Sequence, residues 1–407
     1  MRRALARMSV LLVSVALAGL IGAPSASSAN AHASSKAVCP SPDRGTARCH
    51  ALVVTDAQGN PMATSGPTGY GPDQFHTAYG LPTTAASAQT IAIVDAYDAP
   101  TIAQDLAAYD AAFGLPVFPT CSSTITTSCF QKVNQSGQAG PLPRKNAGWA
   151  LEISLDVEVA HAICQDCKIL LVEANSNSFA DLAAAVNTAA AMGANVISNS
   201  YGGSESSGTS TFASAYNHQG IAITVSSGDG GYGVESPASF NTVVAVGGTT
   251  LNIDSGNAYV GESVWSGTGS GCSGYFSARM FQQNAAGWAA TGCGTSRGVV
   301  DVAADANPTT GAAVYDSTRY QGMTGWFKVG GTSLSAPLIG AVYALAGGNH
   351  TTPANYPATY AYAAAGTAAL HDVTSGSNGS CSTTMCTGAA GYDGPTGVGT
   401  PNGLGGF

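Results

Sequence analysis

The chain has 407 residues, of which 44% are hydrophobic and only 9% are charged. That length suffices for a sizeable core, and plentiful apolar residues with a modest net charge exclude a disordered chain. Lysine and arginine total 14 against 23 aspartate and glutamate residues, which gives a net charge of −9. Because nucleic acids require a basic surface, we expect no nucleic-acid partner.

Residues 1–31 have the pattern of a secretory signal peptide. Arg2, Arg3 and Arg7 form a positive start, an apolar run follows, and Ala29-Asn30-Ala31 is a small-x-small cleavage site. The apolar run is too short to span a bilayer. We therefore predict a secreted, extracellular protein that has no membrane contact once the signal is removed.

All ten cysteines follow the predicted cleavage site. An even number of cysteines in a secreted chain indicates disulfide bonds. Each cysteine has a near neighbour in the sequence, so five local bridges are the simplest connectivity. The predicted pairs are Cys39–Cys49, Cys121–Cys129, Cys164–Cys167, Cys272–Cys293 and Cys381–Cys386. A redox or zinc pair at Cys164 and Cys167 is the alternative, but the sequence has no second CxxC to complete a zinc site.

The first segment after the signal, residues 32–69, is rich in Ser, Gly, Pro and Ala, which predicts a linker-like N-terminal extension. From Tyr70 onward, short apolar runs alternate with helical patterns. The predicted elements are a strand at 90–97, a helix at 101–113, a surface excursion at 119–147, a helix at 148–163, a strand at 168–174, a helix at 179–192, a strand at 194–200, a helix at 209–218, and strands at 221–226 and 242–246.

This alternation predicts an α/β fold, a doubly wound and mostly parallel sheet with helices on both faces. No repeat or domain break interrupts residues 70–407, so we expect one domain there. In such folds the active residues gather outside the carboxyl ends of the strands.

The strongest local motif is Gly330-Gly-Thr-Ser-Leu-Ser-Ala-Pro337, which precedes an apolar helix. Pro337 is expected in the first helical turn, which places Ser333 at the N-terminus of that helix. Unpaired N–H groups at a helix N-terminus favour a developing anion. Ser333 is therefore a candidate nucleophile, with a simple N-cap serine as the alternative.

A nucleophilic serine needs a base. Glu152 and Asp156 lie four residues apart, about 40° from each other on one face of the helix predicted at 148–163. Their apolar neighbours disfavour a merely solvated acidic face, so the pair is an acid–base candidate. His161 lies about 140° round the helix from Asp156 and fits a packed histidine better. A third carboxylate, Asp229, follows the strand predicted at 221–226, where a turn-forming aspartate is the alternative.

Four segments in this order resemble the sedolisin family, which are serine-carboxyl peptidases with a subtilisin-like fold. The segments are Glu152-Ile-Ser-Leu-Asp156, Ser227-Gly-Asp229, Pro237-Ala followed by Val243-Val-Ala-Val-Gly-Gly-Thr-Thr250, and Gly330-Gly-Thr-Ser-Leu-Ser-Ala-Pro337. The resemblance covers about residues 70–407. It implies that Ser333 is the nucleophile and Glu152 its base. It also implies that Asp156 orients Glu152 and that Asp229 is the oxyanion partner.

Such a site would operate below neutral pH. A carboxylate base still works where histidine would be protonated, and an aspartic acid donates a hydrogen bond to an oxyanion only while protonated. We expect a monomeric endopeptidase that cleaves proteins and peptides through an acyl-enzyme. One alternative is an inactive binding module of the same fold. Another is a conventional subtilisin that uses Asp95 and His161, but the sequence lacks the His-Gly-Thr-His segment of those enzymes.

Asp372 and Asp393 bracket a Gly/Ser-rich loop, and two carboxylates with backbone carbonyls suit a hard cation such as calcium. The resemblance implies one structural calcium ion. Its ligands would be those two side chains and the carbonyl oxygens of Val373, Ala389 and Gly391. Ala389 stands where glycine is more usual, which a carbonyl donor tolerates if its φ is negative.

The segment before the peptidase-like region departs from the family. Sedolisins commonly carry a long N-terminal prodomain, whereas only residues 32–69 separate the predicted signal from Tyr70. The resemblance therefore leaves the route of activation open.

Overall fold

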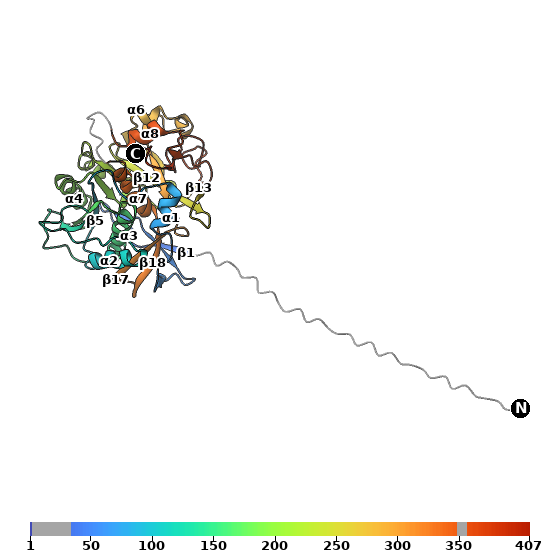
Figure 1. Cartoon of the computed structure of the whole chain (residues 1–407). Coiled ribbons are helices and arrows are strands. Elements are labelled where there is room, and N and C mark those ends of the chain that lie inside the picture. Colours follow the sequence, from blue (N-terminus) through green and yellow to red (C-terminus); the bar gives the residue numbers. More distant parts are fainter. Residues whose placement is uncertain (2–33, 348–355) are drawn as a thin grey trace. The chain divides into compact units, whose positions relative to one another are not determined.

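The structure is a computed structural model that describes Met1, residues 34–347 and residues 356–407 (Figure 1). Apart from Met1, the predicted signal peptide lies outside the described residues. Within these ranges, no helix is both long enough and apolar enough to cross a membrane.

Eight strands form the central sheet. Their order is β13 (Tyr259–Val264), β12 (Val244–Ile253), β10 (Ala222–Ser226), β8 (Val196–Asn199), β5 (Thr90–Ala96), β7 (Lys168–Ala174) and β6 (Phe130–Asn134), with β16 (Val302–Asp305) also paired to β12. Only the β12–β13 pair is antiparallel. The inner strands are buried except for the first residues of β5 and β7, as a sheet covered by helices requires. The predicted mostly parallel sheet is confirmed.

Two long helices connect this sheet to the candidate site. Helix α3 (Ala147–Ile163) packs on α7 (Thr332–Leu345), and α7 packs on β8, β10 and β12 near the middle of the molecule (Figure 1). Helix α4 (Phe179–Ala191) packs on β5 and β7, and α2 (Ile102–Phe113) packs on α3. The shorter helices are α1 (Pro72–Tyr79), α5 (Ser207–Ser210), η1 (Ala213–Tyr216), α6 (Met280–Gln283), η2 (Trp288–Thr291) and α8 (Ala358–Ala364).

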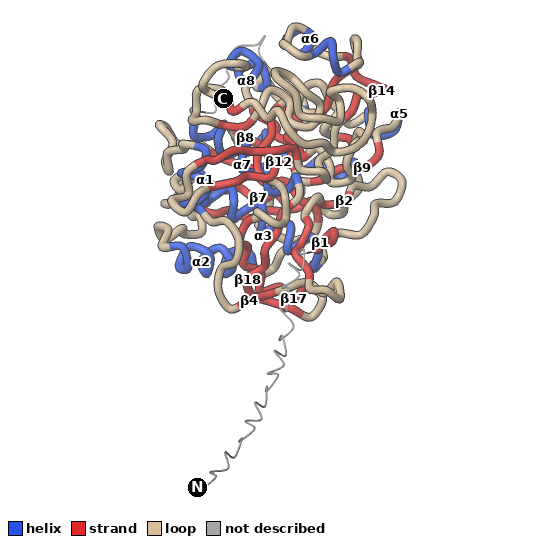
Figure 2. The backbone as a smooth tube through the Cα atoms, turned by 90° about the vertical axis from the view of Figure 1, so that its right-hand side faces the viewer, coloured by secondary structure: helices blue, strands red, loops and turns tan. Residues whose placement is uncertain are grey.

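A second, antiparallel sheet joins the start of the described chain to its later part. Its strands are β1 (Ser34–Ala37), β3 (Leu52–Thr55), β18 (Met323–Gly330) and β17 (Ala312–Tyr320), with β4 (Ala63–Thr64) on β18. Figure 2 shows these strands together at the lower end of the molecule. Smaller sheets pair β2 (Arg48–Cys49) and β11 (Glu235–Ser236) with β9 (Tyr201–Ser204), β14 (Gly271–Ser277) with β15 (Ser296–Val299), and β19 (Leu370–His371) with β20 (Thr400–Pro401).

The structure differs from the sequence-based prediction in three segments. Residues 34–64, expected to be linker-like, contain β1 to β4 and belong to the same compact unit as the described residues that follow them. The excursion at 119–147 contains the edge strand β6, and the helix expected at 209–218 is two short turns, α5 and η1. Long-range pairing partners stabilise β1–β4 and β6, and local composition does not reveal those partners.

All five predicted disulfide bonds are confirmed, and the described residues contain no free cysteine. Each bridge closes a local loop, with sequence separations of 3 to 21 residues. The pairing of Cys164 with Cys167 leaves no thiolate there for zinc.

Candidate active site

The two acidic residues of α3 lie completely inside the protein. The helix starts at Asn146, whose side chain accepts hydrogen bonds from the N–H groups of Gly148 and Trp149. Glu152 and Asp156 both have 0% of their surface exposed. Since α3 is buried almost from end to end, burial, and not an exposed acidic face, determines the chemistry of this pair.

Ser333 lies at the start of α7, immediately after strand β18. Gly331 makes the sharp turn between them with φ of 98°, a backbone conformation that favours glycine. Pro337 is the sixth residue of α7 and not, as predicted, part of its first turn. Because proline has no N–H, the carbonyl of Ser333 loses its helical partner, and the Ser200 hydroxyl donates to that carbonyl at 3.5 Å.

The fold brings Ser333 together with the predicted base. The Ser333 hydroxyl lies near the Glu152 carboxyl and partly opposes the rise that burial causes in its pKa, while Oγ donates to the carbonyl oxygen of Ser200 at 3.3 Å. Oε1 of Glu152 has no hydrogen-bond partner. Burial raises the pKa of Glu152 well above its usual value, and the charges of Asp156 and Asp95 raise it further. Ser333 itself is fully buried.

Asp95 is a site residue that the favoured interpretation of the sequence left out. It is the residue before last of strand β5 and is buried, and neither of its carboxyl oxygens has a hydrogen-bond partner. Burial raises its pKa well above the usual value, with Asp156 and Glu173 adding to the effect. The signal in the sequence was a charged residue at the carboxyl end of an apolar strand.

Asp229 reaches the site from the loop after β10. Its Oδ1 accepts hydrogen bonds from the N–H (2.8 Å) and the hydroxyl (2.9 Å) of Thr332, whereas its buried Oδ2 accepts none. Burial raises the pKa of Asp229 to about 6, against the opposing effects of His50, Thr332 and Arg48. Burial is therefore the main cause of this shift.

His161 does not belong to the site. Its Nε2 lies 3.2 Å from a carboxyl oxygen of Asp110 on α2, and its ring packs on Phe118 at a centroid distance of 4.0 Å. The histidine is fully buried there. The packed-histidine interpretation is confirmed, which removes the base that a conventional subtilisin mechanism would need.

The predicted metal ligands form a separate loop cluster near the C-terminus. Asp393 is buried, and its oxygens accept from the N–H groups of Ala389 (2.9 Å) and Thr396 (2.9 Å). Asp372 accepts from the N–H of Gly391 at 2.9 Å. Burial raises the pKa of Asp393 to about 7, and the neighbouring charge of Asp372 adds to this shift.

Comparison with known proteins agrees with this geometry. A family model described as the subtilase family matches residues 121–390. Sedolisin from Pseudomonas sp. (strain 101) is 28% identical over 84% of this chain, and kumamolisin from Bacillus sp. (strain MN-32) is 30% identical over 89%. The matches cover 60% of the former and 68% of the latter, so the chain spans about two thirds of the length of these relatives.

Solved structures give the same result. The structure described as Pseudomonas sedolisin, a serine-carboxyl proteinase complexed with two molecules of pseudo-iodotyrostatin, superposes with a TM-score of 0.68 at 26% identity, covering 83% of this chain and 96% of that one. Sphericase, at 18% identity and a TM-score of 0.50, shares the fold. From the family match, these relatives and the meeting of Ser333 with Glu152, we conclude that the chain belongs to the subtilase family and, within it, to the sedolisins.

Proposed function

We propose that this chain is a secreted serine-carboxyl endopeptidase that hydrolyses peptide bonds in proteins at acidic pH. The observation that carries the proposal is the placement of Ser333 beside the buried Glu152 carboxyl, whose Oε1 has no hydrogen-bond partner, next to an aspartate that also has one unpartnered oxygen. Family membership supports the same reaction.

The proposed reaction begins when Ser333 Oγ attacks the carbonyl carbon of the scissile bond and its proton passes to ionised Glu152. The resulting oxyanion accepts a hydrogen bond from Oδ2 of protonated Asp229. The C–N bond then breaks, and Glu152 returns the proton to the leaving amine. Water repeats the sequence on the acyl-enzyme, which frees the acid product and restores Ser333.

Asp156 and Asp95 are proposed to position and tune Glu152. The three carboxyl groups are buried together and repel each other when ionised. They therefore titrate as a group that carries fewer negative charges than it has carboxyls. Burial raises the pKa of Asp156 well above its usual value, and the Ser200 hydroxyl opposes only part of that shift. A negative charge shared in this cluster keeps Glu152 able to accept the proton of Ser333.

The decisive experiment is a pH–rate profile on an unfolded protein substrate, measured for the mature protein and for Ser333→Ala. We expect wild-type cleavage to be confined to acidic pH and the variant to lose it, by on the order of 10⁴-fold or more. Retained cleavage by Ser333→Ala, or an optimum near pH 8, would reject the proposal. A folded wild-type protein without any cleavage would favour the binding-module alternative.

We also propose one structural calcium ion at the loop cluster of Asp372 and Asp393. The two carboxylates are close enough for the charge of Asp372 to raise the pKa of Asp393, and the ion pairs of the described residues include neither. Ala389 has a negative φ, as its proposed carbonyl role needs. With the carbonyl oxygens of Val373 and Gly391, this donor set fits a hard cation, which would neutralise the pair.

Removing calcium should lower the melting temperature by a few degrees without removing a catalytic group. A ligand present at 100 times its Kd stabilises by about 2.7 kcal/mol, and the ion would be lost on chelation. Melting curves with and without chelator, together with elemental analysis, test this. Unchanged melting in a protein that contains no calcium would reject the site.

We further propose that the protein is secreted and monomeric. Five disulfide bonds are typical of an oxidising compartment, in agreement with the predicted signal peptide. The expected partners are protein or peptide substrates. Sedimentation of the secreted protein would test the monomer.

A further inference from the structure

A segment of the chain itself, residues 48–55, runs past the catalytic residues. Strand β2 pairs antiparallel with β9, and the N–H of His50 continues that pairing by donating to the carbonyl of Ser200 at 3.1 Å. Strand β3 then pairs antiparallel with β18, with Leu52 opposite Gly330. Because β9 starts directly after Ser200 and β18 ends just before Ser333, both halves of the segment are tied to strands that lead to the active site.

The peptide group between His50 and Ala51 is oriented as a substrate would be. The N–H of Ala51 donates to Oε2 of Glu152 at 2.9 Å, so the base faces the atom that would become the leaving amine. The carbonyl oxygen of His50 faces the other side: a Cβ on Gly331 would lie 1.9 Å from it and 2.6 Å from Oδ2 of Asp229. The two ends of one peptide group therefore face the proposed base and the proposed oxyanion donor.

The side chain of His50 fills a polar subsite next to this bond. Its Nε2 lies 3.0 Å from Oε2 of Glu235, and its Nδ1 lies 2.7 Å from the hydroxyl of Ser226. The imidazole is fully buried, whereas the Glu235 side chain is 23% exposed. Burial raises the pKa of Glu235, but His50 and Arg48 outweigh it, so this pKa is below its usual value. The subsite therefore carries the carboxylate of Glu235 and already holds the imidazole of His50, with Arg48 in the same segment.

We propose that Glu235 makes the cleft select a cationic side chain, Arg, Lys or protonated His, on the acyl side of the scissile bond. The inference rests on the proposed peptidase function. Residues 48–50 of this chain occupy the cleft and show how such a substrate would bind. A cavity of about 200 Å³, lined by Gly228, Gly233 and Glu235 among others, leaves space for side chains longer than histidine. A hydrogen bond to a charged group corresponds to a preference of about 10- to 100-fold.

The first experiment measures how tightly the segment is bound in the cleft, in a variant that cannot cleave peptides. In a Ser333→Ala background, the rate of hydrogen exchange at the amide of Ala51 reports how firmly the cleft holds the segment. His50→Arg should keep that amide protected, and His50→Glu should reduce protection by about 10-fold or more, because two carboxylates would then meet. Equal protection in the two variants would overturn the proposal, whether or not the wild-type protein is a peptidase.

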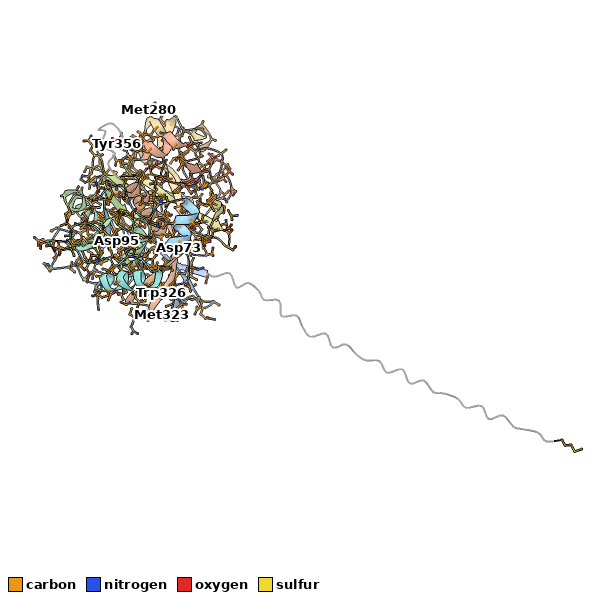
Figure 3. All side chains as sticks on the ribbon, in the orientation of Figure 1. Asp73, Asp95, Met280, Met323, Trp326 and Tyr356 are labelled. Carbon is orange, nitrogen blue, oxygen red and sulfur yellow. A yellow bond between two sulfur atoms is a disulfide. The ribbon has the colours of Figure 1, made fainter. Side chains whose placement is uncertain are left out.

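The second experiment measures selectivity in the active protein. Peptides that differ only at the residue before the scissile bond carry Arg, Lys, His, Gln, Leu or Glu, and all of them compete with the resident segment. Ratios of kcat/KM are therefore compared, and the ratio of Arg to Gln should be about 10 to 100. Glu235→Gln should bring this ratio close to 1, and Glu235→Asp should restore part of it. Asp73→Asn is the matched control, because Asp73 is an exposed acidic residue on α1 (Figure 3) and its loss should keep the wild-type ratio.

The outcomes of the second experiment separate the two proposals. Ser333-dependent cleavage with equal rates on the Arg and Gln peptides would refute the role of Glu235 and leave the peptidase intact. A change of the ratio in Asp73→Asn as large as in Glu235→Gln would also overturn the assignment, since net charge alone would then explain it. Absence of all cleavage would reject the peptidase, and the hydrogen-exchange comparison would still decide the subsite.

Discussion

Two groups of buried carboxyls, each with at least one member on helix α3, differ in what surrounds them. The catalytic cluster consists of Asp95, Glu152 and Asp156, and the structural cluster consists of Asp105, Glu158 and Asp316. In both clusters burial is the first cause of raised pKa values. Asp95, labelled in Figure 3, is fully buried and lies one residue before the end of β5.

Hydrogen bonds distinguish the two clusters. In the structural cluster, Glu158 accepts from the N–H of Tyr315 at 2.9 Å, which fastens α3 to β17. Asp105 similarly accepts from the hydroxyl of Ser317 at 2.6 Å. In the catalytic cluster both oxygens of Asp95 have no hydrogen-bond partner, and Glu152 faces the hydroxyl of Ser333.

A raised pKa therefore does not identify a catalytic carboxyl. Glu152 and Glu158 are equally buried on the same helix, but only Glu152 meets a nucleophile and the peptide group of Ala51. The partner, and not the extent of burial, separates a base from a residue that holds two elements together.

The largest expected effect is a difference in activity between variants of the two glutamates of α3, Glu152 and Glu158. Glu152→Gln should lower kcat/KM by on the order of 10⁴-fold, because an amide cannot take the proton of Ser333. Glu158→Gln should stay near the wild-type value, since Gln still offers an oxygen to Tyr315. Steady-state kinetics of both variants, with circular dichroism as the folding control, measure the difference. Equal losses would show that the structural cluster also serves catalysis.

A smaller effect concerns Asp229, whose pKa is raised to about 6. Wild-type activity should fall as pH rises through this value, because the proton that Oδ2 donates is lost. Asp229→Asn should cost about 100-fold in kcat but keep a donor that does not titrate. Its remaining activity should therefore persist to higher pH. An unchanged alkaline limb in this variant would assign that limb to another group.

The smallest expected effect is on stability. Groups with raised pKa values bind more protons in the folded state than in the unfolded state, so stability is highest near pH 4 and falls as pH rises. The decline should extend through pH 6 to 8, where Asp229, Asp316 and Glu173 have pKa values of about 6, 7 and 8. Urea unfolding at several pH values measures it.

The variant Glu158→Gln tests whether the buried carboxyls cause the fall of stability with pH. Removing one carboxyl with a raised pKa should make the decline shallower, because the folded and unfolded states then no longer differ in the binding of that proton. The variant should gain stability relative to wild type at pH 8 but not at pH 4. A stability that rises with pH in the wild-type protein would show that the buried carboxyls are ionised without cost.

The sequence alone predicted the parallel sheet, the helix that carries Glu152 and Asp156, and, as the simplest connectivity, the five disulfide pairs that the structure contains. These features depend on local periodicity, on one helical repeat and on short loops, which are properties of neighbouring residues. The motif around Ser333 was visible for the same reason, since a tight turn before a helix needs its glycines in adjacent positions.

Only the tertiary structure decided which of these groups meet. Asp95 joins Glu152 and Asp156 because β5 and α3 pack together, and the apparent linker at 34–64 becomes sheet because its partners, β9 and β18, lie more than a hundred residues away. The cause of the raised pKa of Asp229 also had to come from the structure, since burial depends on every element around a carboxyl and not on its sequence neighbours.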